Sequence, residues 1–190
     1  MSEDFVTVVS GLPRSGTSMM MQALEAGGLP VLTDGVRRAD EDNPKGYYEF
    51  EPVKSTARDA GWVAQATGKT VKMVYRLLRD LPREYQYRVV FMRRNMDEVL
   101  VSQKIMLRRS NRTEGNVPDE KMAAILETDV ESICRWVEDQ DNFRLLRVDY
   151  GEMMRSAFEQ CQRISRFLDD GVDAAKMASA VDPSLYRNRR

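Results

Sequence analysis

The chain has 190 residues, a net charge of −1 and 42% hydrophobic residues, and it contains no histidine. This length predicts a single domain over residues 1–190 with a full hydrophobic core, and the balance of acidic and basic residues predicts no nucleic-acid partner, which would require a basic excess. The lack of histidine excludes this residue as a general base or metal ligand, and Cys134 and Cys161, which lack metal-binding or redox spacing, are predicted to be buried free thiols.

The sequence shows no secretion signal and no apolar run that approaches transmembrane length. We therefore expect a cytoplasmic protein without a membrane span. A homo-oligomer is compatible with the sequence.

The first predicted element is a buried strand, Phe5–Val9, whose short β-branched run is typical of a parallel sheet. The turn after it contains Gly11 and Gly16, and a helix then runs from Thr17 until the Gly27-Gly28 pair. The first N–H groups of a helix have no partner within the helix. Because they face the turn, they form a site for an anion such as a phosphate group.

Strands and helices alternate along the rest of the chain. The polar loop Asp34–Lys45, extending to Gly46, is either a lid or a plain solvated loop. The basic segment Asp182–Arg190 is expected to be a disordered tail. Strands are predicted over Thr70–Tyr75, Tyr87–Met92 and Asn142–Val148, with a short one near Leu29–Leu32 and a turn-like connection over Leu77–Pro82. Helices are predicted over Pro52–Thr67, Met96–Arg109, Asp119–Asp139, Glu152–Leu168 and Asp173–Ala180.

This alternation predicts an α/β fold with a central, mostly parallel sheet of about four to five strands and helices on both faces. Ligands of such sheets bind beyond the carboxyl ends of the strands. Arg14, Arg94 and Tyr150 each come just after a predicted strand. We therefore expect these three residues to converge on one edge of the sheet.

The turn after the first strand differs from the common nucleotide-binding loop G-x-x-x-x-G-K-[ST], because Thr17 stands where that loop has lysine and the cation is Arg14. The six residues from Pro13 to Ser18 resemble the 5′-phosphosulfate loop of PAPS-dependent sulfotransferases, whose pattern is Pro-(Lys/Arg)-x-Gly-Thr-(Thr/Ser). The resemblance implies a three-layer P-loop-type fold and cofactor binding by Pro13, Arg14, Ser15, Gly16, Thr17 and Ser18. A tight turn without a ligand is the alternative.

A second segment, from Arg94 to Ser102, combines an arginine at a strand end with a hydroxyl two helical turns beyond Asn95, about 10 Å along the helix axis. It is similar to the 3′-phosphate-binding motif of sulfotransferases, R-[ND]-x-x-[DE]-V-x-x-S. The resemblance implies that Arg94 and Ser102 bind the 3′-phosphate. The alternative is a capped helix with an arginine beside its start.

A third segment, Val148–Met153, is similar to the family's Y-E-D-(M/L) segment, although Gly151 replaces the usual acid. The resemblance implies that Tyr150 lies near the adenine of PAPS. A plain junction between strand and helix is the alternative.

The resemblance implies transfer of a sulfuryl group from PAPS to a hydroxyl or amine, with 3′,5′-ADP as the product and no metal ion. Lys72 lies inside a strand and is predicted either to point at the transferring group or to face solvent at an edge. Many members use histidine as base, and this chain has none. Asn43–Glu49 looks like the bacterial N-P-x-G-(Y/F/W)-(Y/F/W)-E segment, so we expect Glu49 to be the general base, with Glu51 second. The alternative is that Glu49 is a surface carboxylate in an acidic loop.

The acceptor, a small molecule or a glycan, is left open by the sequence. Two other functions remain. One is a P-loop kinase or NTPase, for which Asp149 is the obvious carboxylate at a strand end. The other is a nucleotide-binding module without turnover.

Overall fold

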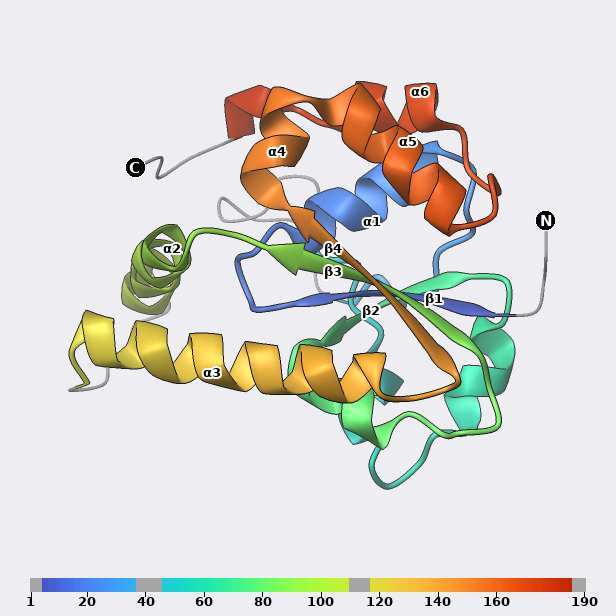
Figure 1. The fold of residues 1–190 in the computed structure, drawn as a ribbon, viewed down its shortest axis with the longest axis horizontal. Coiled ribbons are helices and arrows are strands. Elements are labelled where there is room, and N and C mark those ends of the chain that lie inside the picture. Colours follow the sequence, from blue (N-terminus) through green and yellow to red (C-terminus); the bar gives the residue numbers. More distant parts are fainter. Residues whose placement is uncertain (1–4, 37–45, 110–116, 186–190) are drawn as a thin grey trace.

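The structure is a computed structural model that describes residues 5–36, 46–109 and 117–185. Its centre is a parallel sheet of four strands with the order β2-β1-β3-β4 (Figure 1). The strands are β1 (Val6–Gly11), β2 (Thr70–Val74), β3 (Tyr87–Arg93) and β4 (Phe143–Asp149). Every residue of β1 is buried, as expected for an apolar strand that is covered on both faces.

Helices cover both faces of the sheet (Figure 1). One face packs on α1 (Thr17–Ala26), α4 (Tyr150–Arg155), α5 (Ala157–Phe167) and α6 (Ala174–Ala180), through a core that includes Met20, Leu24 and Ile164. The other face packs on α3 (Asp119–Glu138) and on three 3₁₀ segments, η1 (Glu51–Ser55), η2 (Gly61–Ala66) and η3 (Tyr75–Asp80). The predicted α/β class with a parallel sheet between helical layers is confirmed.

The helix α2 (Met96–Arg109) lies beyond the carboxyl end of β3 rather than over a sheet face, and a 3₁₀ turn, η4 (Pro183–Leu185), follows α6 (Figure 1). None of the helices in the described part of the chain is long and apolar enough to cross a membrane. Cys134 and Cys161 are both free and buried, as predicted.

The predicted helix over Pro52–Thr67 is wrong. The segment forms the two 3₁₀ segments η1 and η2, and the second begins at Gly61, whose N–H donates to the carboxylate of Asp59 (2.9 Å). Glycine weakens a continuous helix, and an aspartate that binds nearby backbone offers an alternative to it. The apolar residues of this segment, including Trp62 and Val63, are nevertheless buried.

Three other predicted boundaries also change. The helix expected over Glu152–Leu168 is two helices, α4 and α5, because Ser156 has non-helical φ and ψ angles (−138° and 52°) and caps both. The strand expected over Leu29–Leu32 is a single bridge from Val31 to Thr70, and the connection over Leu77–Pro82 belongs largely to η3.

The strand order reverses direction between β1 and β3. The chain leaves β1 for β2 on one side and then crosses to β3 on the other side of β1. Open parallel sheets bind ligands at such a reversal, beyond the carboxyl ends of the strands. The register aligns these ends, since Gly11 pairs with Val74 on one side and with Met92 on the other.

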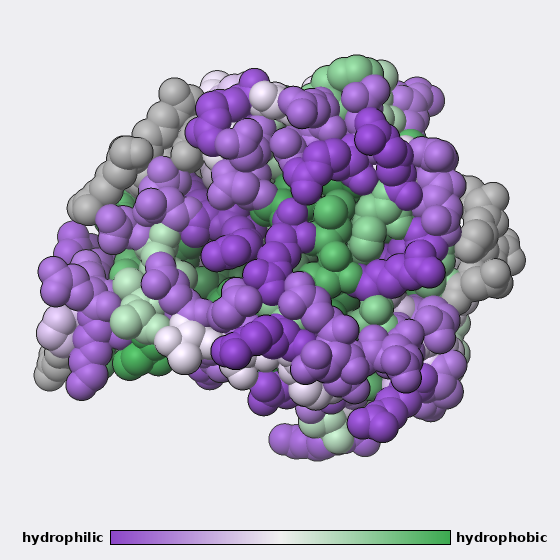
Figure 2. Space-filling view, viewed as in Figure 1, coloured by the Kyte–Doolittle hydropathy of each residue, from purple (hydrophilic) through white to green (hydrophobic). Residues whose placement is uncertain are grey.

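The edge strand β4 leaves part of the hydrophobic interior visible. Figure 2 shows hydrophobic residues along the middle of one face, framed by hydrophilic residues of the helices above and below. Leu145 and Leu146 of this strand are only partly buried.

Candidate functional site

The loop between β1 and α1 has the backbone shape of an anion site. Arg14 and Gly16 have positive φ angles (75° and 98°), and the N–H of Ser15 closes the turn by donating to the carbonyl of Leu12 (3.1 Å). The helix α1 begins directly after this loop at Thr17, and no side chain caps its N-terminus. Its first N–H groups and the positive end of its dipole therefore favour a bound anion.

The side chains of the first two motifs meet. Nε of Arg14 donates to Oγ of Ser102 at 2.8 Å, and Nη1 of Arg94 donates to the carbonyl oxygen of Arg14 at 3.3 Å. The amide of Gln103 also donates to the carbonyl of Pro13 (3.4 Å). The loop after β1 and the helix after β3 therefore form one cationic cluster at the predicted edge of the sheet, although Arg14 and Ser102 are 88 residues apart.

Arg94 is held in place by two neighbours. Its Nε donates to the carboxylate of Glu98 at 2.8 Å, and the two side chains are only 9% and 3% exposed. Its guanidinium lies over the ring of Tyr150, 4.6 Å from the ring centre. A buried pair with this geometry fixes the plane of the guanidinium. The sequence analysis gives Glu98 no role, although its spacing of four from Arg94 is the spacing of helical ion pairs.

Tyr150 also packs against the loop. A Cβ atom at Gly16 would lie 2.4 Å from Cδ2 of the Tyr150 ring, so the close approach requires glycine at this position. Arg14, Arg94, Ser102 and Tyr150 thus belong to one cluster, as their positions after the strands predict.

A second group of predicted residues lines a cavity of about 130 Å³ on the β2 side of the loop. Thr17, Glu49 and Lys72 contribute its polar wall, and Lys54 also borders it. Nζ of Lys72 donates to the carbonyl of Tyr47 and, at 3.4 Å, to Oγ of Ser18. Lys72 therefore points toward the loop and not to solvent.

The segment that carries Glu49 is anchored on both sides. The hydroxyl of Tyr48 donates to the carboxylate of Glu25 on α1 (2.6 Å), and burial, together with this bond, raises the pKa of Tyr48 well above its usual range. On the other side, the carbonyl of Glu49 accepts from the N–H of Asp34 (3.1 Å) and the hydroxyl of Thr33 (2.9 Å). These bonds position the backbone of Glu49 beside the cavity.

Glu51, the second candidate base, lies outside this cavity. Its side chain is 65% exposed and pairs with Nζ of Lys54 at 2.7 Å. The backbone N–H groups of Val36 (3.0 Å) and of Glu51 (2.6 Å) donate to the carboxylate of Asp34 and lower its pKa. Oε2 of Glu49 also lies 3.7 Å from Nζ of Lys54, so the two glutamates differ in that Glu49 borders the cavity and Glu51 does not.

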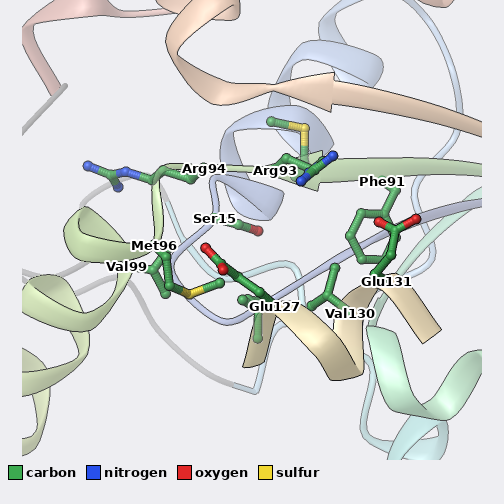
Figure 3. A pocket seen from close by; sticks show the side chains of 11 residues that line it. Ser15, Phe91, Arg93, Arg94, Met96, Val99, Glu127, Val130 and Glu131 are labelled. Carbon is green, nitrogen blue, oxygen red and sulfur yellow. The ribbon is translucent and has the colours of Figure 1, made fainter. Parts of the chain in front are cut away.

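Ser15 does not join either group through its side chain. It borders a separate cavity of about 360 Å³ between β3 and α3, where Glu127 extends toward Ser15, Glu131 lies beside Phe91 and the guanidinium of Arg94 extends away from both glutamates (Figure 3). Its Oγ is buried and has no hydrogen-bond partner within the described residues.

Asp149 is poorly placed for a magnesium ion. Its carboxylate accepts the N–H of Glu152 (2.9 Å) as the N-cap of α4, and it borders a cavity with Arg93, Arg94 and Arg147. Cations nearby disfavour a divalent metal. No group of three or more Asp, Glu, Cys or His residues in the described ranges is arranged to hold a metal ion.

Some predicted features lie outside the described residues. They are most of the candidate lid, with Asn43–Lys45 of the segment before Glu49, and the end of the basic tail from Tyr186 onward.

No protein-family model matches the sequence, and a comparison with curated proteins finds no match. Solved structures do match. The crystal structure of mouse sulfotransferase SULT7A1 complexed with PAP aligns with a TM-score of 0.53 and 21% identity over 95% of this chain. The sulfotransferase domain from the curacin biosynthetic pathway aligns with a TM-score of 0.53 and 12% identity, over 97% of this chain and 86% of that domain.

The chain has the sulfotransferase fold. A third structure with this fold, retinol dehydratase in complex with androsterone and inactive cofactor PAP, aligns with a TM-score of 0.50 and 15% identity over 92% of this chain. The chain spans 63% of the length of the mouse sulfotransferase and 62% of that of retinol dehydratase, so both of those proteins contain residues that do not align with this chain.

Proposed function

We propose that this protein is a sulfotransferase that moves a sulfuryl group from PAPS to a hydroxyl or amine acceptor without a metal ion. The observation that carries the proposal is the hydrogen bond between Arg14 and Ser102, because it joins the two motifs that would hold the two phosphate ends of PAPS. The fold supports the same conclusion, since two of the similar structures are crystallised with PAP, which is 3′,5′-ADP.

The residues present fit a doubly phosphorylated adenosine. The uncapped start of α1 and the guanidinium of Arg14 would bind the 5′-phosphosulfate, and Arg94 with Ser102 would bind the 3′-phosphate. Arginine forms bidentate bonds to phosphate, and the buried Glu98 keeps Arg94 oriented for them. Tyr150 would contact the nucleoside from its place beside Gly16 and Arg94.

The catalytic roles follow from where charge develops in the reaction. Negative charge grows on the bridging oxygen of the leaving phosphate, and positioned donors lower the barrier by stabilising that charge. Arg14, Lys72 and the N–H groups at Thr17 and Ser18 would supply these donors. Glu49 would accept the proton that the acceptor loses.

Thermal unfolding with 3′,5′-ADP tests the proposal. At a concentration 100 times Kd, a ligand that binds only the folded state stabilises it by about 2.7 kcal/mol. This corresponds to a rise in Tm of about 5–10 °C for a chain of this size. We expect this rise without added metal, and its loss in Arg14→Ala. Arg83→Ala, at an exposed position outside the site, is the matched control.

Two outcomes contradict the proposal. A rise in Tm only with ATP and Mg²⁺ would favour a kinase or NTPase. Binding of 3′,5′-ADP that is unchanged in Arg14→Ala would place the nucleotide elsewhere on the protein.

A further inference from the structure

We propose that two adjoining cavities beside β3 and α3 form a binding site for a free α-amino acid with an apolar side chain. One cavity, of about 360 Å³, is the one that Ser15 borders, and the other has a volume of about 420 Å³. They adjoin, since both are bordered by Arg93, Arg94, Met96 and Glu127. Each volume is in the range of small-molecule sites. The inference goes beyond the proposed sulfuryl transfer and can be tested without PAPS.

Each cavity is bordered by a residue with a buried polar atom that lacks a partner. Within residues 5–36, 46–109 and 117–185, the buried side-chain nitrogen and oxygen atoms without a hydrogen bond are Oγ of Ser15 and Nε of Arg147. Ser15 is only 1% exposed and borders the first cavity, and Arg147 borders the second. Buried polar groups nearly always have a partner, which can be a bound molecule. Two such atoms at adjoining cavities therefore indicate a polar ligand.

The charges around the cavities indicate that this ligand is a zwitterion. Neither Arg93 nor Glu127 has an ion pair or a side-chain hydrogen bond within the described part of the chain. Other charged residues nearby are engaged, because Arg147 pairs with Glu131 (3.1 Å) and Asp149 caps α4 (2.9 Å). A simple anion would lie beside the carboxylate of Glu127, and a simple amine would lie beside the guanidinium of Arg93. A ligand with both charges avoids both repulsions.

An α-amino acid complements these groups in their arrangement. Because Glu127 borders both cavities, an ammonium bound to its carboxylate lies where the cavities meet. Glu127 also extends toward Ser15 (Figure 3), whose hydroxyl can accept a hydrogen bond from the same ammonium. The carboxylate of the ligand would then enter the second cavity, where Arg93 and Nε of Arg147 are donors. Bonds between such ionised groups are the strong ones in a binding site.

The side chain of the ligand would occupy the first cavity, whose lining is largely apolar. Residues of four elements contribute to it, namely Leu12, Phe91, Met96, Val99 and Val130. Phe91 and Val130 lie together, across from Glu127 (Figure 3). A polar side chain would lose its hydrogen bonds to water there. We therefore expect an apolar side chain such as that of phenylalanine.

The proposed nucleotide site lies on another side of Arg94. The guanidinium of Arg94 extends away from Glu127 and Glu131 (Figure 3), and it lies over the ring of Tyr150 and bonds to Glu98. The group that would bind the 3′-phosphate therefore points away from the two cavities. An amino acid and 3′,5′-ADP can accordingly be bound at the same time.

A series of four ligands tests the three parts of the site. L-phenylalanine is compared with 3-phenylpropionate, which lacks the ammonium, with 2-phenylethylamine, which lacks the carboxylate, and with glycine, which lacks the side chain. Ligand-observed NMR titrations of the full chain, without nucleotide, give each Kd. We expect L-phenylalanine to bind, and each of the other three to bind about 10-fold or more weakly.

Two variants assign the charges of the ligand to residues. Glu127→Gln is expected to raise the Kd of L-phenylalanine about 10-fold or more and to leave that of 3-phenylpropionate unchanged. Arg93→Gln is expected to weaken L-phenylalanine equally and to leave 2-phenylethylamine unchanged. Both side chains are exposed, so the fold should persist, which Tm checks. Glu120→Gln, on the same helix as Glu127, and Arg83→Gln are the matched controls at exposed positions outside the cavities.

The outcomes separate this inference from the proposed function. If L-phenylalanine does not bind at millimolar concentration, or binds no better than glycine, the amino-acid site is wrong, whether or not 3′,5′-ADP binds. If Glu127→Gln and Arg93→Gln both bind L-phenylalanine as the controls do, the ligand binds elsewhere. If Glu127→Gln also abolishes the rise in Tm with 3′,5′-ADP, the cavities belong to the nucleotide site, and a separate site is refuted.

Discussion

Replacing Gly16 by alanine tests whether the loop after β1 and the support of Arg94 form one packed unit. A Cβ atom at Gly16 would lie 2.4 Å from Cδ2 of Tyr150, a separation that real Cβ atoms do not show. The ring must therefore move, and the guanidinium of Arg94 lies over that ring, 4.6 Å from its centre. We expect Gly16→Ala to lower both the free energy of unfolding and the affinity for 3′,5′-ADP.

Gly28 allows the clash to be separated from backbone strain. Both glycines have a positive φ, +98° at Gly16 and +96° at Gly28, but no atom lies within 4 Å of a Cβ built at Gly28. Alanine in this region costs about 1–2 kcal/mol at either position. Overlap in a packed site adds about 1–3 kcal/mol at Gly16 only. The expected losses are therefore about 1–2 kcal/mol for Gly28→Ala and about 2–5 kcal/mol for Gly16→Ala.

Urea denaturation measures these losses, and isothermal titration calorimetry measures the Kd for 3′,5′-ADP. The double variant Gly16→Ala/Tyr150→Leu removes the overlapping ring edge, so its loss is expected to be smaller than the sum of the single losses by about 1–3 kcal/mol. Equal losses for Gly16→Ala and Gly28→Ala would refute the clash. An unchanged Kd in Gly16→Ala would refute the coupling between the loop and Arg94.

Three other changes have defined outcomes. Glu98→Gln removes the buried partner of Arg94 and is expected to lower the free energy of unfolding by about 1–3 kcal/mol in urea denaturation; no loss would show that the pair is not structural. Glu49→Gln is expected to cut turnover about 100-fold or more with an unchanged Kd for 3′,5′-ADP, and normal turnover would remove this residue from the mechanism. Burial raises the pKa of the Cys134 and Cys161 thiols to about 11, so about 0.1% is thiolate at pH 8; mass spectrometry should find them alkylated only after unfolding, and rapid labelling of the folded protein would contradict this.

The sheet was predictable because its strands are short, apolar and regularly spaced. The predicted strands over Thr70–Tyr75 and Tyr87–Met92 differ from β2 and β3 by one residue each. The backbone of Pro52–Thr67 was not predictable in the same way. Its apolar residues are buried as a helix would bury them, but the backbone forms 3₁₀ turns on either side of the break before Gly61. Apolar periodicity reports which residues are buried, and it does not report the type of turn between them.

The candidate site was predictable where the backbone topology determines it. Arg14 and Arg94 follow adjacent strands, so parallel pairing is enough to bring them together. The stacking of Arg94 on Tyr150 and the contact of Tyr150 with Gly16 depend on side-chain packing between elements far apart in the chain, and no spacing in the sequence signals them. The spacing of Arg94 and Glu98 did carry a signal, since helical neighbours four apart form ion pairs.

Lys72 connects the start of α1 with the segment that carries Glu49. An isolated cation in a strand predicts a partner, and the structure gives two, the carbonyl of Tyr47 and the hydroxyl of Ser18. Ser18 belongs to the first turn of α1, beside the anion site, and Tyr47 lies two residues before Glu49. The ammonium group therefore ties the proposed phosphosulfate loop to the segment that carries the proposed base. Thr17, the first residue of α1, borders the same 130 Å³ cavity as Glu49 and Lys72, so the start of α1 and the segment of Glu49 meet at that cavity.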